Sequence, residues 1–163
     1  MAEPSPIRPT DDEARALAAT LMREARTVAL GVIEPGTSVP MVTRIAIAVE
    51  GAGSPVALVS AFSQHTTALQ GTPGASLLFG EPGAKGDPLT HPRLTVQAEA
   101  AFVPRSGDAH AGFRALWLSR HPKAKLYVDF GDFVFVRFRP LRAYLNGGFG
   151  RAFVLTPDDL RQG

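Results

Sequence analysis

Hydroxyl and imidazole side chains gather in residues 60–69, where an apolar run ends and a short helical pattern begins. The hydroxyl and imidazole side chains of this segment are Ser60, Ser63, His65, Thr66 and Thr67. A helix that starts directly after a strand presents free backbone N–H groups and the positive end of its dipole to an anion. The segment therefore fits a phosphate-binding site, and on residue types alone it fits an ordinary helix N-cap with solvated hydroxyls equally well.

Two arginines outside this segment are further candidates for ligand contacts. Arg44 interrupts an apolar strand pattern. If Val42, Ile45 and Ile47 share the inner face of a barrel, the Arg44 guanidinium could reach a phosphate over the rim. Arg93 opens a later strand, where it could donate hydrogen bonds to a heterocycle. Each arginine also fits a plain surface role, either covering a sheet face with its stem or forming a salt bridge at the rim.

A glycine-rich turn, Asn-Gly-Gly-Phe-Gly-Arg-Ala in residues 146–152, is the third candidate site. Gly147 and Gly148 permit backbone conformations and close approaches to a ligand that other residues do not. Phe149 and Arg151 could contact a bound aromatic partner. The turn is not a dinucleotide fingerprint, because no strand–turn–helix unit surrounds it. A flexible hairpin turn is the alternative interpretation.

The composition excludes several classes of site. The chain has 163 residues and no cysteine, which rules out disulfides, thiolate metal sites and cysteine nucleophiles. The four histidines are dispersed, so no metal site is expected. The motifs GxSxG, Walker A and HExxH are absent. No residue is an obvious general acid or base, so the catalytic residues stay unassigned.

The charge is distributed unevenly along the chain. The net charge is +2, and most of the basic residues follow residue 84. This asymmetry favours a phosphorylated ligand over nucleic acid, because the basic residues do not alternate with aromatic residues that could stack on bases. The first residues lack the layout of a signal peptide, and no run has the length of a membrane span. We therefore expect a cytoplasmic protein with neither a nucleic-acid nor a membrane partner.

The hydrophobic patterns place these candidates on a mainly β chain. Residues 1–9 are predicted to be a flexible, proline-rich tail, and residues 10–163 a single domain. Helices are predicted at residues 11–26, 66–70 and from 106 or 108 to about 120, and strands at 27–34, 41–50, 56–61, 75–79, 93–103, 130–138, 142–145 and 153–155. The short connections favour antiparallel neighbours and hence a small β-barrel with peripheral helices.

Four segments in a fixed order carry a family resemblance. They are residues 58–67 (Leu-Val-Ser-Ala-Phe-Ser-Gln-His-Thr-Thr), 87–96 (Asp-Pro-Leu, then Pro-Arg-Leu-Thr-Val), 121–133 (His-Pro-Lys-Ala, then Tyr-Val-Asp-Phe-Gly-Asp-Phe) and 146–152. With these segments the chain resembles the pyridoxamine 5'-phosphate oxidase-related FMN-binding split barrels, most closely their haem-utilisation (HugZ-type) branch. The resemblance extends from about residue 27 to residue 152. One difference is Ala68, which stands where the family has an asparagine.

The resemblance implies a fold, a cofactor and a partner. The fold is an antiparallel, six-stranded, Greek-key-type split barrel with FMN in the cleft between the two subunits of a homodimer. The implied cofactor-binding residues are Ser60, Ser63, His65, Thr66 and Thr67 with Thr43 and Arg44 at the phosphate and ribityl end, Arg93 at the flavin ring, and Gly147, Gly148, Phe149 and Arg151 closing over the cofactor or substrate.

The function implied by the resemblance is that of an FMN-dependent oxidoreductase. In such an enzyme the flavin carries out the redox chemistry and the protein supplies position and polarity. Two alternatives stay open. One is a haem-utilisation or haem-degrading protein, and the other is a non-catalytic FMN-binding carrier or regulatory barrel.

Overall fold

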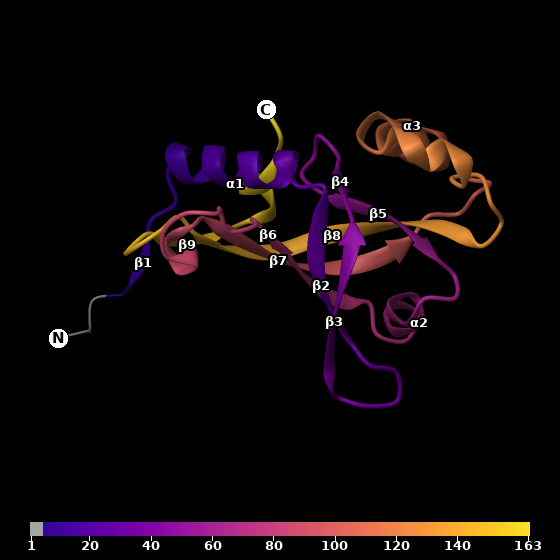
Figure 1. Ribbon diagram of the computed structural model, residues 1–163, viewed down its shortest axis with the longest axis horizontal. Coiled ribbons are helices and arrows are strands. Elements are labelled where there is room, and N and C mark those ends of the chain that lie inside the picture. Colours follow the sequence, from indigo (N-terminus) through magenta and orange to yellow (C-terminus); the bar gives the residue numbers. More distant parts are fainter. Residues whose placement is uncertain (1–4) are drawn as a thin grey trace.

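A nine-stranded sheet makes up most of the computed structural model, which describes residues 5–163 (Figure 1). Its strands are β1 (Ile7–Arg8), β2 (Thr27–Ile33), β3 (Pro40–Ala46), β4 (Ala48–Val49), β5 (Pro55–Ser60), β6 (Gly74–Phe79), β7 (Arg93–Phe102), β8 (Phe133–Asn146) and β9 (Ala152–Leu155). The helices are α1 (Asp12–Glu24), α2 (Gln64–Gly71) and α3 (Asp108–Arg120), with short 3₁₀ helices η1 (Pro88–Thr90), η2 (Pro122–Leu126) and η3 (Pro157–Leu160). The predicted mainly β class with peripheral helices is confirmed.

Antiparallel ladders connect the strands in the order β3–β2–β6–β7–β8–β5–β4. Only Ile47 separates β3 from β4, so one chain segment pairs with β2 at its start and with β5 at its end. Because of this segment, the first and last strands of the series lie next to each other, although no ladder joins β3 to β5 among the described residues. The result is a six-membered antiparallel barrel that is interrupted at Ile47 instead of closing through continuous ladders.

The first residues add one more strand to the edge of the sheet. β9 pairs with the end of β8, and Ile7–Arg8 pairs in parallel with β9. Two residues of the predicted flexible tail therefore belong to the sheet. Residues 1–4 of that tail lie outside the described part of the chain.

β8 is one strand of 14 residues, and the prediction of two shorter strands in its place is wrong. The prediction ended the first strand before Pro140, which has no N–H to donate to a ladder. In the structure the ladder between β7 and β8 shifts its register between Gln97 and Ala98. Leu141 is left unpaired at this point as the extra residue of a β-bulge. A bulge is one of the few places in a sheet where proline is tolerated, so the strand continues past Pro140.

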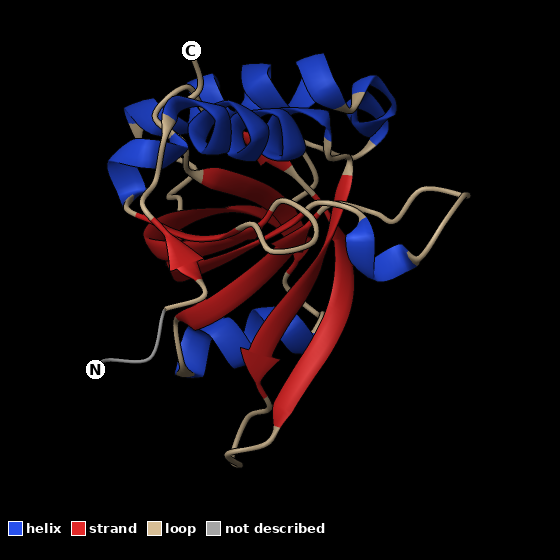
Figure 2. Ribbon diagram, turned by 90° about the vertical axis from the view of Figure 1, so that its left-hand side faces the viewer, coloured by secondary structure: helices blue, strands red, loops and turns tan. Residues whose placement is uncertain are grey.

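Two clusters of buried side chains lie on opposite sides of β5. The first fills the barrel, where Ala14 and Met22 of α1 pack against strand residues. The second lies between the sheet and α3, and its largest member is Trp117. β5 contributes Ala57 to the first cluster and Val56 to the second, which explains why the strand is a continuous apolar run. In both views the β2–β3 hairpin projects away from α1 and α3 (Figures 1 and 2).

Candidate functional site

The hydroxyl-rich segment lies at a strand-to-helix junction, as its sequence predicts, because α2 begins four residues after β5 ends. Thr66 is completely buried, and its hydroxyl donates a hydrogen bond to the Ser60 carbonyl at 2.7 Å. Thr66 therefore fastens α2 to the end of β5. The Ser60 hydroxyl accepts the N–H of Phe62 at 3.2 Å.

Two hydroxyls at the junction have no protein partner among the described residues. Ser63 is the N-cap of α2, yet its side chain makes no capping hydrogen bond. Thr67 is exposed in the first turn of the helix and its hydroxyl makes no hydrogen bond there either. Both side chains are available to a ligand that approaches the start of α2.

β3 meets α2 at this junction. The Thr43 hydroxyl oxygen lies 3.4 Å from Nδ1 of His65. Burial lowers the pKa of His65, which favours the neutral imidazole. The structure thus brings together two residues that the sequence placed far apart and that the resemblance assigned to one phosphate.

Arg44 lies on the opposite side of β3 from Thr43, since neighbouring strand residues alternate between faces. The expected inner face of Val42, Ile45 and Ile47 is wrong, because Val42 is 68% exposed while the two isoleucines are buried. Arg44 itself is exposed and makes no hydrogen bond or ion pair within residues 5–163. Its guanidinium therefore has no internal counter-charge.

A cavity of about 240 Å³ lies between the β2–β3 hairpin and α2. Its lining residues are Glu34, Pro35, Met41, Phe62, Gln64 and Thr67. Phe62 is 85% exposed, so an aromatic ring stands at the edge of this cavity. The lining combines apolar residues with an amide, a hydroxyl and a single carboxylate, so it suits the hydroxyl groups of a ligand better than its anionic end.

Arg93 and the glycine-rich turn both contact η1. The Arg93 guanidinium donates a hydrogen bond to the Leu89 carbonyl at 2.9 Å, and Arg93 pairs with Asn146 across the β7–β8 ladder. Gly148 has a φ of +117°, and a Cβ there would lie 3.3 Å from the Thr90 carbonyl oxygen. Glycine is therefore needed at this position for both its conformation and the close contact with η1.

The glycine-rich turn connects β8 to β9 as a hairpin loop that is closed by a backbone hydrogen bond, and only the ring of Phe149 extends from it into solvent. The N–H of Gly147 donates to the Arg151 carbonyl at 2.8 Å. The Arg151 side chain is directed to α1, where it pairs with Glu13 at 3.3 Å. Phe149 is 97% exposed. Phe149 is therefore the side chain of the turn best placed to touch a ligand or a second molecule.

The two groups of site residues predicted from the sequence do not meet within one chain. α2 lies towards one end of the long axis of the molecule, and β9, which follows the turn, lies towards the other (Figure 1). The cavity beside Arg93, of about 260 Å³, is lined by Thr95, Tyr144 and Asn146 among others and is separate from the cavity beside α2.

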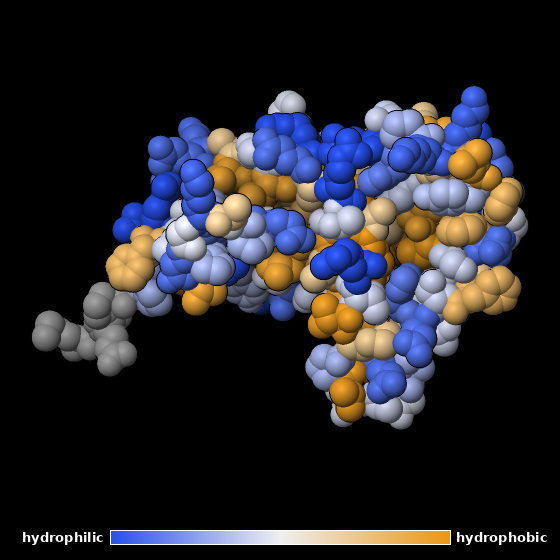
Figure 3. All heavy atoms as spheres, viewed as in Figure 1, coloured by the Kyte–Doolittle hydropathy of each residue, from blue (hydrophilic) through white to orange (hydrophobic). Residues whose placement is uncertain are grey.

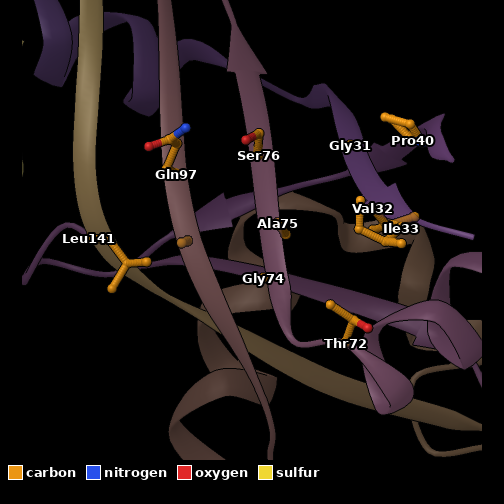
Figure 4. Close-up of a pocket in the computed structure, with 11 residues that line it drawn as sticks. Gly31, Val32, Ile33, Pro40, Thr72, Gly74, Ala75, Ser76, Gln97 and Leu141 are labelled. Carbon is orange, nitrogen blue, oxygen red and sulfur yellow. The ribbon is translucent and has the colours of Figure 1, made fainter. Parts of the chain in front are cut away.

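A third cavity, of about 480 Å³, was not predicted from the sequence (Figure 4). It opens on the outward side of β2, β6, β7 and β8, and its lining residues are Gly31, Val32, Ile33, Pro40, Thr72, Gly74, Ala75, Ser76, Gln97, Ala98 and Leu141. None of these lining residues is charged. Two features of the sequence are related to this cavity, namely Gly31 inside one strand pattern and Pro140 between two others. Neither feature locates a cavity unless the register of the sheet is known.

Two features are absent from residues 5–163, the part of the chain that the structure describes. No group of three or more His, Cys, Asp or Glu side chains is arranged to hold a metal ion. No helix in this part of the chain is long and apolar enough to cross a membrane.

The order of ladders, the interruption at Ile47 and the β5–α2 junction define a mainly β split-barrel protein. The chain belongs to the CREG β-barrel family, whose model matches residues 9–161. The predicted resemblance to the pyridoxamine 5'-phosphate oxidase-related split barrels and their haem-utilisation branch is confirmed at the level of family and fold.

Three relatives illustrate this assignment. The non-canonical haem oxygenase HOZ of Arabidopsis thaliana chloroplasts is 35% identical over 117 residues, which cover 71% of this chain and only 34% of HOZ. A haem-binding protein from Mycobacterium smegmatis is 28% identical with a TM-score of 0.82, over 94% of this chain and 61% of that one. A protein of the pyridoxinephosphate oxidase family from Clostridium acetobutylicum shares the fold, with 12% identity and a TM-score of 0.70 over 93% and 99% of the two chains.

Proposed function

We propose that this chain binds FMN at the β5–α2 junction and acts as an FMN-dependent oxidoreductase. The observation that carries the proposal is the pair of hydroxyls there that lack protein partners among the described residues, Ser63 and Thr67, together with the unpaired Arg44 on the outward side of the neighbouring strand β3. A phosphate monoester needs several donors and a positive charge, and a helix start with an unneutralised arginine nearby supplies both. FMN, when bound, supplies the redox chemistry.

Each residue near the junction has a distinct part in this proposal. The Ser63 hydroxyl and the first N–H groups of α2 donate to the phosphate. β3 has a ladder partner on one side only, so Arg44 can reach the phosphate around the free edge of the strand. The cavity that contains Glu34 and Gln64 accepts the hydroxyls of the ribityl chain. Thr66 positions the helix and makes no contact with the ligand, because its hydroxyl is already bonded to Ser60.

The remaining predicted residues require a second subunit. Arg93 pairs with Asn146 at the start of the turn that carries Phe149, and β9, which follows this turn, lies towards the opposite end of the molecule from α2 (Figure 1). In this proposal these residues approach the flavin ring from another copy. We therefore include in the proposal a homodimer with FMN between the subunits. In each of the two equivalent sites one subunit holds the phosphate and the other supplies Arg93 and the turn.

Haem is the second candidate ligand. Two relatives, HOZ and the Mycobacterium smegmatis protein, are haem proteins by name and share 35% and 28% of the aligned residues. His65 provides a neutral imidazole whose Nε2 has no hydrogen-bond partner among the described residues, which is the form that binds haem iron. The same junction would then hold an iron ligand in place of a phosphate.

Parallel titrations of the purified protein with FMN and with haemin, followed by absorption spectroscopy, test the two candidates. We expect FMN to bind at micromolar concentration, and Arg44→Ala to weaken it at least about tenfold, since loss of one charge-assisted contact costs about 1.5 kcal/mol or more. Arg161→Ala, at an exposed arginine paired with Asp158 near the C-terminus, is the matched control and leaves the affinity unchanged.

Other outcomes of the titrations decide against parts of the proposal. If micromolar FMN causes no spectral change, FMN is not the ligand. If haemin binds and His65→Ala removes its spectral signature, the haem proposal replaces the first. If FMN binds but neither NADH nor NADPH nor any added acceptor exchanges electrons with it under anaerobic conditions, the protein is a carrier and the oxidoreductase proposal fails.

A further inference from the structure

Arginines from the end of α1 and the end of α3 meet on one side of the molecule. The Arg26 guanidinium donates a hydrogen bond to the Arg120 carbonyl at 3.5 Å, and the Arg120 guanidinium donates one to the Arg23 carbonyl at 2.6 Å. A cation at a helix C-terminus satisfies carbonyls that have no partner within the helix. The two helix ends therefore cap each other, and in doing so they hold three arginines close together.

The positive charge continues along η2, which follows α3 directly and exposes Lys123 and Lys125. None of the three arginines or two lysines forms an ion pair within residues 5–163. Glu24 is the single acidic residue in residues 20–27 and 120–127. The helix ends offset only part of the charge, since each carries roughly half a negative charge. We call Arg23, Arg26, Arg120, Lys123 and Lys125 the basic surface.

Apolar side chains are exposed beside these cations. Leu126 at the end of η2 is 79% exposed, and Phe130 is 56% exposed. A 3₁₀ helix has about three residues per turn, so Lys123 and Leu126 project from the same side of η2. The space-filling view shows strongly hydrophilic and apolar residues next to each other over α3 (Figure 3). One partner can therefore contact both kinds of side chain.

The basic surface lies away from the proposed cofactor site. In both ribbon views α1 and α3 lie on one side of the molecule, whereas α2 and the tip of the β2–β3 hairpin lie on the other (Figures 1 and 2). The proposed contacts to FMN use none of the residues of the basic surface. A partner that binds there is therefore additional to the cofactor.

We propose that the basic surface, together with Leu126, docks on an anionic lipid bilayer. Its charges are distributed over two helix ends and η2, which matches a plane of many phosphate groups better than one small anion. Clusters of Lys and Arg are attracted to the negative potential of such a plane, and an exposed leucine can enter the boundary between headgroups and acyl chains. No helix among residues 5–163 could cross a bilayer, and contact with its surface needs none.

Sedimentation with sucrose-loaded vesicles tests the basic surface. We expect the wild-type protein to bind vesicles with roughly one third phosphatidylserine but not vesicles of phosphatidylcholine alone, and added salt to weaken the binding. Lys123→Glu combined with Leu126→Ser should lower the partition coefficient at least about tenfold, with an unchanged circular dichroism spectrum. The loss follows because one charge is reversed and one apolar side chain is removed from the same contact.

The matched control makes the same two changes elsewhere. Lys85→Glu combined with Leu89→Ser alters net charge and apolar exposure equally in the loop between β6 and β7, where both side chains are exposed. This control should bind the anionic vesicles at close to wild-type strength. An equal loss in the two double variants would show that net charge alone governs binding, which overturns the inference.

Arg23→Glu is the second variant, needed if the Lys123 and Leu126 double variant does not fold. Arg23 is exposed, and its guanidinium bonds within residues 5–163 only to Thr20 in the same helix, so the fold tolerates the change. We expect several-fold weaker vesicle binding. A wild-type protein that does not bind the anionic vesicles at low salt overturns the inference. So does a protein that binds polyglutamate or an oligonucleotide but not vesicles, because its partner is then a different polyanion.

Discussion

Thr66 and Thr67 are adjacent threonines with opposite surroundings. Thr66 is completely buried with its hydroxyl bonded to Ser60, whereas Thr67 is exposed with a hydroxyl that has no partner within the described chain. The first therefore maintains the junction and the second is available to the ligand. Their roles can be separated by experiment.

Replacement of Thr66 by Val should lower the free energy of unfolding by about 1–2 kcal/mol, because the completely buried side chain loses its hydrogen bond to the Ser60 carbonyl. Urea denaturation measures the change. Thr67→Val serves as the control and should alter stability by less than about 0.5 kcal/mol, as exposed substitutions usually do. Equal losses in the two variants would show that Thr66 does not fasten α2 to β5.

Residue types alone identified the junction but not its geometry. The apolar run followed by hydroxyls predicted a strand and a helix start, and both are present. The contact between Thr43 and His65 depends on how β3 packs beside α2, which no local pattern records. The inner-face prediction failed because the apolar Val42 faces outward while the polar Thr43 faces inward, where His65 is its neighbour.

At the scale of elements, β8 shows a limit of prediction from sequence patterns. The sequence predicted strands on both sides of Pro140, and both segments are strands. Pro140 lies between the two predicted strands, and proline normally ends a ladder. The bulge at Leu141, which removes that conflict, is a property of the pairing with β7 and could not be read from β8 alone.

The loop between β6 and β7 is braced by one imidazole. Nδ1 of His91 accepts the N–H of Gly83 at 2.8 Å, and Nε2 lies 2.8 Å from the Lys85 carbonyl oxygen. The ring must therefore carry its proton on Nε2. The brace holds the loop that ends in η1, and η1 in turn holds Arg93 and the glycine-rich turn.

Loss of this brace should loosen the loop without unfolding the barrel. We expect His91→Ala to increase the rate of limited proteolysis between residues 80 and 92 several-fold, because two loop hydrogen bonds disappear together. Leu89→Ala, at a 71% exposed side chain of the same loop, is the control and should be cut at the wild-type rate. An unchanged cleavage rate in His91→Ala would mean that the imidazole does not hold the loop.

For the whole molecule, the two buried clusters share the strands β5 and β8, which have the barrel on one side and α3 on the other. Trp117, the single tryptophan, lies in the second cluster and reports on it by fluorescence. Far-UV circular dichroism reports on the helices and strands of the whole molecule. Because the strands are shared, we expect the two signals to change at the same denaturant concentration, as in a two-state transition. A fluorescence change that clearly precedes most of the circular dichroism change would show that α3 unfolds independently.

The fold class could be predicted from the sequence because strand patterns and short connections constrain it directly. The arrangement of the candidate site could not, since only the complete barrel shows that α2, which contains His65, lies away from β9, beside which Arg93 pairs with Asn146 (Figure 1). If the site is divided between two copies, as we propose, a single sequence shows only its separate halves.

The position of β8 in the chain has a consequence for biosynthesis. β8 supplies the ladder partner of β5, β7 and β9, and it is the last long strand to be synthesised. While residues before β8 emerge from the ribosome, β5 has only the two-residue β4 beside it, and its apolar surfaces are uncovered. Pairing between segments so distant in sequence is slow, and unpaired apolar strands aggregate. The nascent chain therefore depends on a late step, and a ribosome that stalls before Phe133 should release a product prone to aggregation.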